Sequence, residues 1–192
     1  MSPRRQQGLR ERVASALLEA AARTFAQEGD QANMADVADA ARVARATLYR
    51  YFPSREALLD ALITYSLDTA GEQLAMARLD QVPVDEGFAR AVRALLVAGD
   101  YFVVLTRERA RFSPEGFERR VATPVRGLIE RGQAEGELRE DIQAPWLLES
   151  LFGVIVSILL AAPRLGIEDM VAAITGLFLD GARSRVHRPP SD

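Results

Sequence analysis

Apolar residues recur every three or four positions along most of the chain, and this spacing constrains the fold more than any other feature of the sequence. Between Leu9 and Gln27, for example, Val13, Leu17 and Ala21 fall on one side of a helix with about 3.6 residues per turn. The strict alternation of apolar and polar residues that indicates β-strands is nearly missing. The pattern predicts an all-α fold of about nine helices.

Residues that start or stop helices divide this pattern into segments. Asn33 followed by Asp36 forms a short capping box, and Ser54 is a good N-cap for a long helix. Gly29 suits a helix end, because glycine readily adopts a left-handed conformation. The clearest predicted helices span residues 9–27, 34–41, 45–51, 55–74, 85–105, 117–134, 146–162 and 167–184, with a connection at 106–116 and a disordered tail at 187–192.

The amino-acid composition excludes several classes of catalytic and metal site. The 192 residues include no cysteine and a single histidine, His187, near the C-terminal end. The lack of cysteine excludes disulfides, thiolate metal sites and cysteine nucleophiles, and the lone histidine argues against a Ser-His-Asp triad or a multi-histidine metal centre. We expect a protein that is not an enzyme, with no catalytic residue, no metal site and no cofactor.

Charge is distributed unevenly along the chain. All 24 basic residues are arginines, and the formal net charge is -3. Residues 1–55 contain nine arginines and six acidic residues, whereas residues 56–192 contain 15 arginines and 21 acidic residues. The basic N-terminal part suggests an anionic partner, although a solvated surface explains so small an excess equally well.

No segment has the character of an export signal or a membrane span. The longest uncharged run lies between Glu149 and Arg164 and has 14 residues, fewer than the roughly 20 that a helix needs to cross a bilayer. Charged residues such as Glu11 and Arg12 interrupt the apolar positions near the N-terminus. We therefore expect a cytoplasmic protein in which the uncharged run forms a buried helix.

Residues 34–52, MADVADAARVARATLYRYF, carry the strongest functional signal. Two helices of about two turns each, joined by a short turn, cannot be stable alone and must pack as a unit on the first helix. Val37 and Leu48 point inward, which turns Arg45 and Arg50 outward. Arginine, hydroxyl and phenol groups on a short protruding helix suit a DNA major groove, so the segment is interpreted as a helix-turn-helix. The alternative is an ordinary helical bundle whose tyrosines are half-buried.

The run ATLYRYFPSREALLDAL, at residues 46–62, resembles the N-terminal domain of the TetR (tetracycline-repressor) family of bacterial transcriptional regulators. The similarity extends from Val13 through Leu59. Members of that family are homodimers with an N-terminal DNA-binding domain and a C-terminal helical domain that binds a small molecule. The resemblance implies a DNA-binding domain at residues 1–53 and an effector-binding and dimerisation domain at residues 54–186.

The resemblance also implies roles for individual residues. Arg45 and Ala46 would approach base edges, and Asn33 would place the start of its helix against a phosphate. The remaining implied contacts, all to backbone phosphates, come from Thr47, Tyr49, Arg50, Tyr51 and Arg55.

Two positions depart from the family pattern and leave the turn geometry and the base contacts open. Arg42 stands where the turn usually has glycine, so it would need a left-handed conformation or could instead add a phosphate contact. Ala44 replaces a Ser-like cap worth about 1 kcal/mol. Four arginines near the N-terminus have two possible roles: they form an arm toward the minor groove, or they stay a solvated end that adds electrostatic attraction. They are Arg4, Arg5, Arg10 and Arg12.

The segment from Trp146 to Ala162 is apolar nearly all the way round and needs cover on every side. A second subunit provides that cover, and so would a position entirely inside the core. With the apolar stripe from Met170 to Gly181, the segment would form a four-helix seam across a two-fold axis. The predicted dimer-interface residues are Phe152, Val156, Leu159, Ile174, Leu177 and Phe178.

The aromatic-rich C-terminal part favours a small apolar or aromatic effector. Most of the candidate lining residues fit ordinary core packing equally well; they are Leu62, Tyr65, Phe88, Val92, Phe102, Phe117, Val121, Trp146 and Ser150. We therefore predict a transcriptional repressor that binds a near-palindromic double-stranded DNA operator as a homodimer and is released when the effector tilts the helix beginning at Ser54. The alternatives are an enzyme that uses the helical cavity and a helical adaptor that does not touch DNA.

Overall fold

The computed structural model describes residues 3–108, 114–161 and 165–184. Within these ranges the regular structure is helical, and the one extended pairing is an isolated bridge between Leu138 and Arg183. The prediction of an all-α fold is confirmed. The predicted tail at residues 187–192 and His187 lie outside the described residues.

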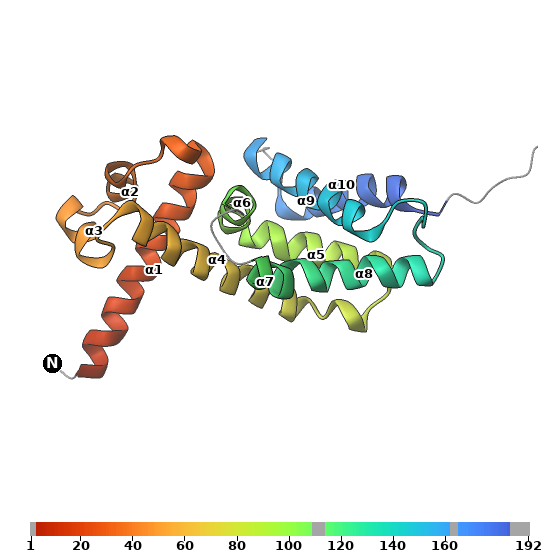
Figure 1. The fold of residues 1–192 in the computed structure, drawn as a ribbon, viewed down its shortest axis with the longest axis horizontal. Helices are drawn as coiled ribbons and strands as arrows, with labels where there is room; N and C mark the ends of the chain where they lie inside the picture. Colours follow the sequence, from red (N-terminus) through yellow and green to blue (C-terminus); the bar gives the residue numbers. More distant parts are fainter. Residues whose placement is uncertain (1–2, 109–113, 162–164, 185–192) are drawn as a thin grey trace, which may run out of the picture.

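Helix α4 connects two groups of helices (Figure 1). Helices α1 to α3 lie at one end of the molecule, with the N-terminal half of α1 projecting away from α2 and α3, and helices α5 to α10 pack together at the other end. The segments are α1 Pro3–Glu28, α2 Met34–Ala40, α3 Arg45–Tyr51, α4 Arg55–Ala77, α5 Val84–Ala98, α6 Asp100–Arg107, α7 Pro114–Phe117, η4 Glu118–Ala122, α8 Thr123–Ala134, α9 Ala144–Ala161 and α10 Ile167–Ala182.

Side-chain caps set the starts of α2 and α4, as the sequence predicts. The Asn33 side chain accepts hydrogen bonds from the N–H groups of Ala35 (2.8 Å) and Asp36 (3.3 Å), and the Asp36 carboxylate accepts one from the Asn33 N–H (2.9 Å). The Ser54 hydroxyl accepts a hydrogen bond from the N–H of Ala57 at 3.1 Å. The capping box and the N-cap of α4 are therefore confirmed, and α3 has the predicted bounds.

The predicted single helix at residues 85–105 is wrong, because the chain breaks at Gly99 into α5 and α6. Gly99 has φ 48° and ψ -117°, a conformation that residues with a Cβ atom rarely adopt. Its N–H still donates to the carbonyl of Leu95 (2.9 Å), so the break is a sharp change of direction directly after the last turn of α5. Because the apolar periodicity continues through the break, the sequence pattern does not predict it.

The predicted connection at residues 106–116 is shorter than expected. Helix α6 continues to Arg107 and α7 already begins at Pro114, while residues 109–113 lie outside the described part of the chain. The predicted helix at 117–134 contains a π-helical segment, η4, between α7 and α8. Pro124 follows directly in α8 and has no N–H to donate to the preceding turn, which favours the wider hydrogen-bonding pattern before it.

Half of the predicted dimer-interface residues belong instead to the interior of the protomer. Phe152, Ile174 and Phe178 are at most 7% exposed. The Phe152 ring contacts Phe102 and Phe117 edge-on, with centroids 5.2 and 5.9 Å apart, and Phe178 packs against another buried ring at 5.1 Å. Periodicity finds this apolar face without saying which neighbour covers it, and in the structure these three side chains are covered within the chain itself.

Helix α9 is the one helix in the described ranges whose length and mean hydropathy of 1.9 would allow it to cross a membrane. Length and composition are the only grounds for that reading, which the core helix of a soluble protein also satisfies. Only 33% of the helix is buried within this protomer, so a large part of its apolar surface still lacks cover.

Gly99→Ala should lower the free energy of unfolding by about 1–3 kcal/mol, because the added Cβ meets both a disfavoured φ and the Leu96 carbonyl oxygen at 3.3 Å. The matched control is Gly127→Ala in α8, where nothing lies within 4 Å of the added Cβ. That change should raise the free energy of unfolding by about 0.5–1 kcal/mol, because alanine favours the helix. Urea unfolding at one protein concentration measures both, and equal effects would contradict the assigned conformation of Gly99.

Candidate nucleic-acid interface

The structure defines the geometry of the turn between α2 and α3, which the sequence left open. Arg42 has φ 56°, the left-handed conformation expected for a position where glycine is usual. The N–H of Val43 donates to the Ala38 carbonyl (3.0 Å), which closes the turn. Ala44 supplies no side-chain cap to α3, as its methyl group predicts. The turn therefore keeps its shape through backbone hydrogen bonds, at the cost of a strained Arg42.

Helix α3 has one buried side and one exposed side. Leu48 is completely buried, as is Val37 of α2, and this packing fixes the rotation of the helix. The exposed residues are those that the sequence turns outward: Arg45, Ala46, Tyr49 and Arg50, with Thr47 half-buried beside them. The arrangement presents two guanidinium groups and a phenol on one face of a protruding helix.

Tyr51 lies at the edge of this face and is half-buried. The guanidinium carbon of Arg50 lies 5.6 Å from the centroid of its ring, and that of Arg10 lies 5.9 Å from it. Arg10 comes from α1, so the structure brings a residue of the N-terminal arginine group to the end of α3. Sequence reasoning missed this contact, because no local pattern links positions so far apart in the chain. The side chains of Arg4 and Arg5 lie outside those described.

Arg55, expected to contact a phosphate, connects three segments of the N-terminal part of the chain. Its Nε–H donates to the Ala32 carbonyl at 3.1 Å, and its guanidinium carbon lies 4.9 Å from the centroid of the Phe25 ring. One side chain thus joins the start of α4 to α1 and to the loop before α2. Its terminal nitrogens are the groups left for a phosphate.

The polar groups of Asn33 are likewise divided between a structural contact and solvent. Its side-chain oxygen and its backbone N–H are both engaged in the capping box with Asp36. The Asp36 carboxylate brings negative charge to the start of α2, which disfavours a phosphate at that helix start. The exposed side-chain amide N–H groups of Asn33 therefore fit a phosphate better than the helix start does.

Helix α6 attaches the C-terminal part of the chain to α1. The Arg107 guanidinium donates to the carbonyls of Ala26 (2.8 Å) and Phe25 (3.3 Å) in the last turns of α1. At the other end of α6, burial raises the pKa of Asp100, and the nearby Arg23 of α1 opposes that shift. Burial also raises the pKa of Tyr101 to about 12, so its phenol stays protonated at neutral pH.

The predicted effector-lining residues fall into two groups. Leu62, Phe88, Val92, Phe102, Phe117 and Val121 are buried in the interior, and Tyr65 is half-buried with its ring 5.5 Å from that of Tyr101. Trp146 is 68% exposed, and Ser150 is also exposed, with its hydroxyl donating to the Trp146 carbonyl. These two residues lie on the outer side of α9, and the structure does not bring them together with the buried residues of the set.

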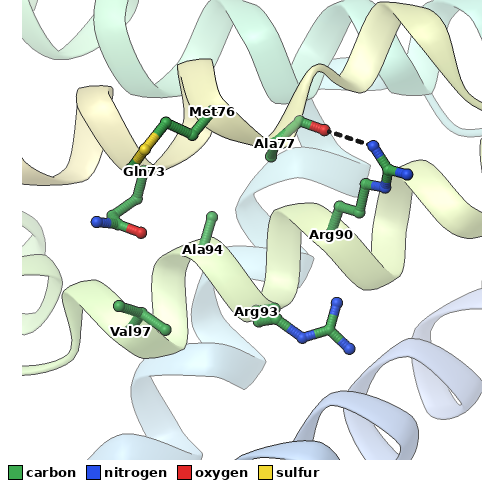
Figure 2. Close-up of a pocket in the computed structure, with 7 residues that line it drawn as sticks. All are labelled: Gln73, Met76, Ala77, Arg90, Arg93, Ala94 and Val97. Atoms are coloured by element: carbon green, nitrogen blue, oxygen red, sulfur yellow. Dashed lines mark hydrogen bonds between the residues drawn. The ribbon is translucent and has the colours of Figure 1, made fainter.

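A solvent-open groove of about 390 Å³ lies between α4 and α5 (Figure 2). Gln73, Met76 and Ala77 border it on one side and Arg90, Arg93, Ala94 and Val97 on the other. The Arg90 side chain donates to the Ala77 carbonyl (3.2 Å) and to Glu86, and Arg93 is paired with Glu168 of α10. Because both guanidinium groups are already neutralised, the groove has little excess charge to attract an anion.

Comparison with known proteins finds relatives of both the N-terminal part and the overall fold. Residues 17–62 match the family described as bacterial regulatory proteins, tetR family. The HTH-type transcriptional repressor LfrR of Mycolicibacterium smegmatis is 37% identical over 98 residues, which are 51% of this chain and 51% of LfrR. The match thus spans about half the length of this curated relative.

Solved structures extend the likeness in fold to nearly the whole chain. The TetR-like regulator LfrR from Mycobacterium smegmatis aligns with a TM-score of 0.70 at 24% identity, covering 91% of this chain and 98% of that one. The same regulator in complex with proflavine aligns with a TM-score of 0.66 at 24% identity, covering 88% and 96%. At this identity the comparison establishes the shared fold.

Proposed function

Since residues 17–62 of this chain match the family described as bacterial regulatory proteins, tetR family, we propose that the protein is a DNA-binding transcriptional repressor. It binds a near-palindromic operator as a homodimer and releases it when a small apolar or aromatic effector binds. As a regulator that binds DNA, it works in the cytoplasm. The observation that carries this proposal is the exposed face of α3, held outward by the burial of Leu48.

The chemistry of that face suits sequence reading in a major groove. The Arg45 guanidinium, at the start of α3, can donate two parallel hydrogen bonds to O6 and N7 of guanine. Tyr49 is 47% exposed and carries a hydroxyl that can donate to a phosphate, as can the neighbouring Arg50. Ala46 leaves room for a close approach to the bases.

A second copy of the chain is the proposed cover for the open faces of α9 and α10. Leu177 is 66% exposed and Leu160 is 44% exposed, and both lie on helices composed mainly of apolar residues. Nothing lies within 4 Å of a Cβ added at Gly153 or Gly176, so these positions allow another helix to approach closely. Trp146 lies on the same face of α9. From the predicted set, Leu177 is exposed and Val156 and Leu159 are half-buried, so these three remain at the seam.

Lipid is a poorer cover than a second copy for the same surface. The exposed positions of α10 include Asp169 and Asp180, and burying either carboxylate in lipid would be costly. In a two-fold seam, such residues can stay at the solvated rim while the apolar residues meet at the centre.

The effector site is proposed for the interior around Phe102, Phe117 and Phe152, whose rings contact one another edge-on. Ser66 of α4 is fully buried, and its hydroxyl has no hydrogen-bond partner among the described residues. Helix α4, which carries Ser66 among its buried residues, packs against α5, α6 and η4 as well as α1. An aromatic effector with one polar group would satisfy both features.

Arg45→Ala should weaken binding to the preferred duplex by about 1–3 kcal/mol, because it removes the paired hydrogen bonds to one base. The preferred duplex comes from selection on fragmented genomic DNA, and fluorescence anisotropy gives the dissociation constants. Arg119→Ala, on the exposed surface of η4, removes the same charge far from α3 and should leave affinity unchanged. If the wild-type protein prefers no duplex over random DNA, the repressor proposal is wrong and the adaptor alternative gains support.

Leu177→Arg should convert the dimer into a monomer, because a two-fold seam would bury two guanidinium groups against apolar residues. Met76→Arg is the matched control, since Met76 is 65% exposed but lies on α4, away from α9 and α10. Sedimentation velocity measures the mass. Trp146, the only tryptophan, should show red-shifted emission in the monomer because it loses its cover. A Leu177→Arg protein that stays dimeric would contradict this interface.

Ser66→Ala should raise the free energy of unfolding by about 1 kcal/mol, because it removes a buried hydroxyl without a partner. The same change should weaken binding of the aromatic probe proflavine about 5–10-fold, as expected for one lost hydrogen bond. Calorimetric titration of proflavine into the protein, without DNA, measures the affinity. Thr64→Ala, which removes an exposed hydroxyl from α4, is the control. The absence of saturable proflavine binding by the wild-type protein would count against an aromatic effector site.

A further inference from the structure

We propose that Arg10 of α1 and Arg50 of α3, whose guanidinium groups both lie near the Tyr51 ring, bind the DNA backbone outside the stretch of bases that α3 reads, with Arg10 contributing one phosphate contact. We call these three residues the α1–α3 clamp. The proposal rests on the proposed function and adds to it a contact from the first helix of the chain.

Arg10 and Tyr51 of the clamp border a groove of about 490 Å³ between α1 and the end of α3. Gln7, Arg10 and Ala14 form its α1 side, at the spacing of successive turns on one helix face, and Tyr51 and Phe52 form the other side. The groove opens to solvent beside the exposed face of α3, and its volume is sufficient for a phosphodiester group. A sugar-phosphate backbone that leaves the major groove beside α3 can therefore pass along it.

The charges of the clamp favour an anion. The Arg10 and Arg50 guanidinium carbons lie 5.9 and 5.6 Å from the same ring centroid, and neither group forms an ion pair with a carboxylate of the described residues. Glu11, the nearest acidic residue of the groove lining, accepts a hydrogen bond from the Gln7 amide at 3.2 Å. Both guanidinium groups therefore keep N–H donors for charge-assisted hydrogen bonds to backbone phosphates beside Tyr51.

The position of Arg10 is fixed because it belongs to a helix. Helix α1 starts at Pro3, and its N-terminal half projects past α2 and α3 (Figure 1). The sequence left open an arm toward the minor groove or a solvated end for this residue, and in the structure it is an exposed residue of α1. Arg12 is exposed on the same helix but lies about 200° around it from Arg10, on the side away from Tyr51.

The test compares Arg10→Ala with Arg12→Ala in the full-length protein on the preferred duplex, at several salt concentrations. Both changes remove one arginine from an exposed site of one helix, so a general electrostatic effect would be equal in the two variants. We expect Arg10→Ala to weaken binding about tenfold and to lower the slope of log K against log salt by about 0.9, the value for one lost phosphate contact. Arg12→Ala should weaken binding less than about twofold and keep the slope.

Two further variants separate a phosphate contact from an effect on Tyr51. Arg10→Lys keeps the charge but loses the planar group, so it should keep the salt slope. Tyr51→Phe removes the hydroxyl that the resemblance assigns to a phosphate, so it should lower the affinity, but it removes no charge and should keep the slope. Equal loss of affinity and slope in Arg10→Ala and Arg12→Ala would overturn the clamp while leaving the repressor function intact. A wild-type protein with no preferred duplex would overturn both proposals.

Discussion

The burial of Leu48 and Val37 is the interaction on which the shape of the proposed DNA-facing surface depends. Helices α2 and α3 have seven residues each, too few for either to be stable on its own. Both residues are completely buried, and Arg55 joins α4, α1 and the preceding loop around them. Since α3 has no side-chain cap at Ala44, packing rather than its own hydrogen bonds fixes how its outer face is turned.

Any change that moves α1 or α4 must therefore move this face as well. Helix α6 provides a route from the C-terminal interior to α1, because Phe102 contacts Phe152 of α9 while Arg107 donates to the last carbonyls of α1. Gly99, in a conformation suited to glycine, lets α6 leave the direction of α5 and reach α1. In this arrangement, a molecule that displaced the aromatic rings would act on α6 and α4 together. The two helices would then act jointly on the orientation of α3.

Local interactions explain why so much of the N-terminal part could be predicted. The capping box of Asn33, the N-cap at Ser54 and the bounds of α3 depend on residues at most a few positions apart, and each was readable from the sequence. The left-handed conformation of Arg42 was one of two alternatives that the family pattern, with glycine at that position, left open. By contrast, the break at Gly99 was hidden because the apolar pattern continues across it. The contacts of Arg10, Arg55 and Arg107 join separate helices, so only the folded chain reveals them.

The same distinction explains why the sequence does not separate the buried residues of α9 and α10 from the exposed ones. An almost wholly apolar helix has no periodic signal to show which side faces the protomer, so its buried residues, such as Phe152, and its exposed ones, such as Trp146, look alike in the sequence. The structure separates them, because one side of α9 meets the aromatic rings of the interior while the other carries Gly153 and Leu160 toward solvent. A surface that is apolar, lined with small residues and uncovered in one protomer would cost free energy in water, and a two-fold partner removes that cost for both chains at once.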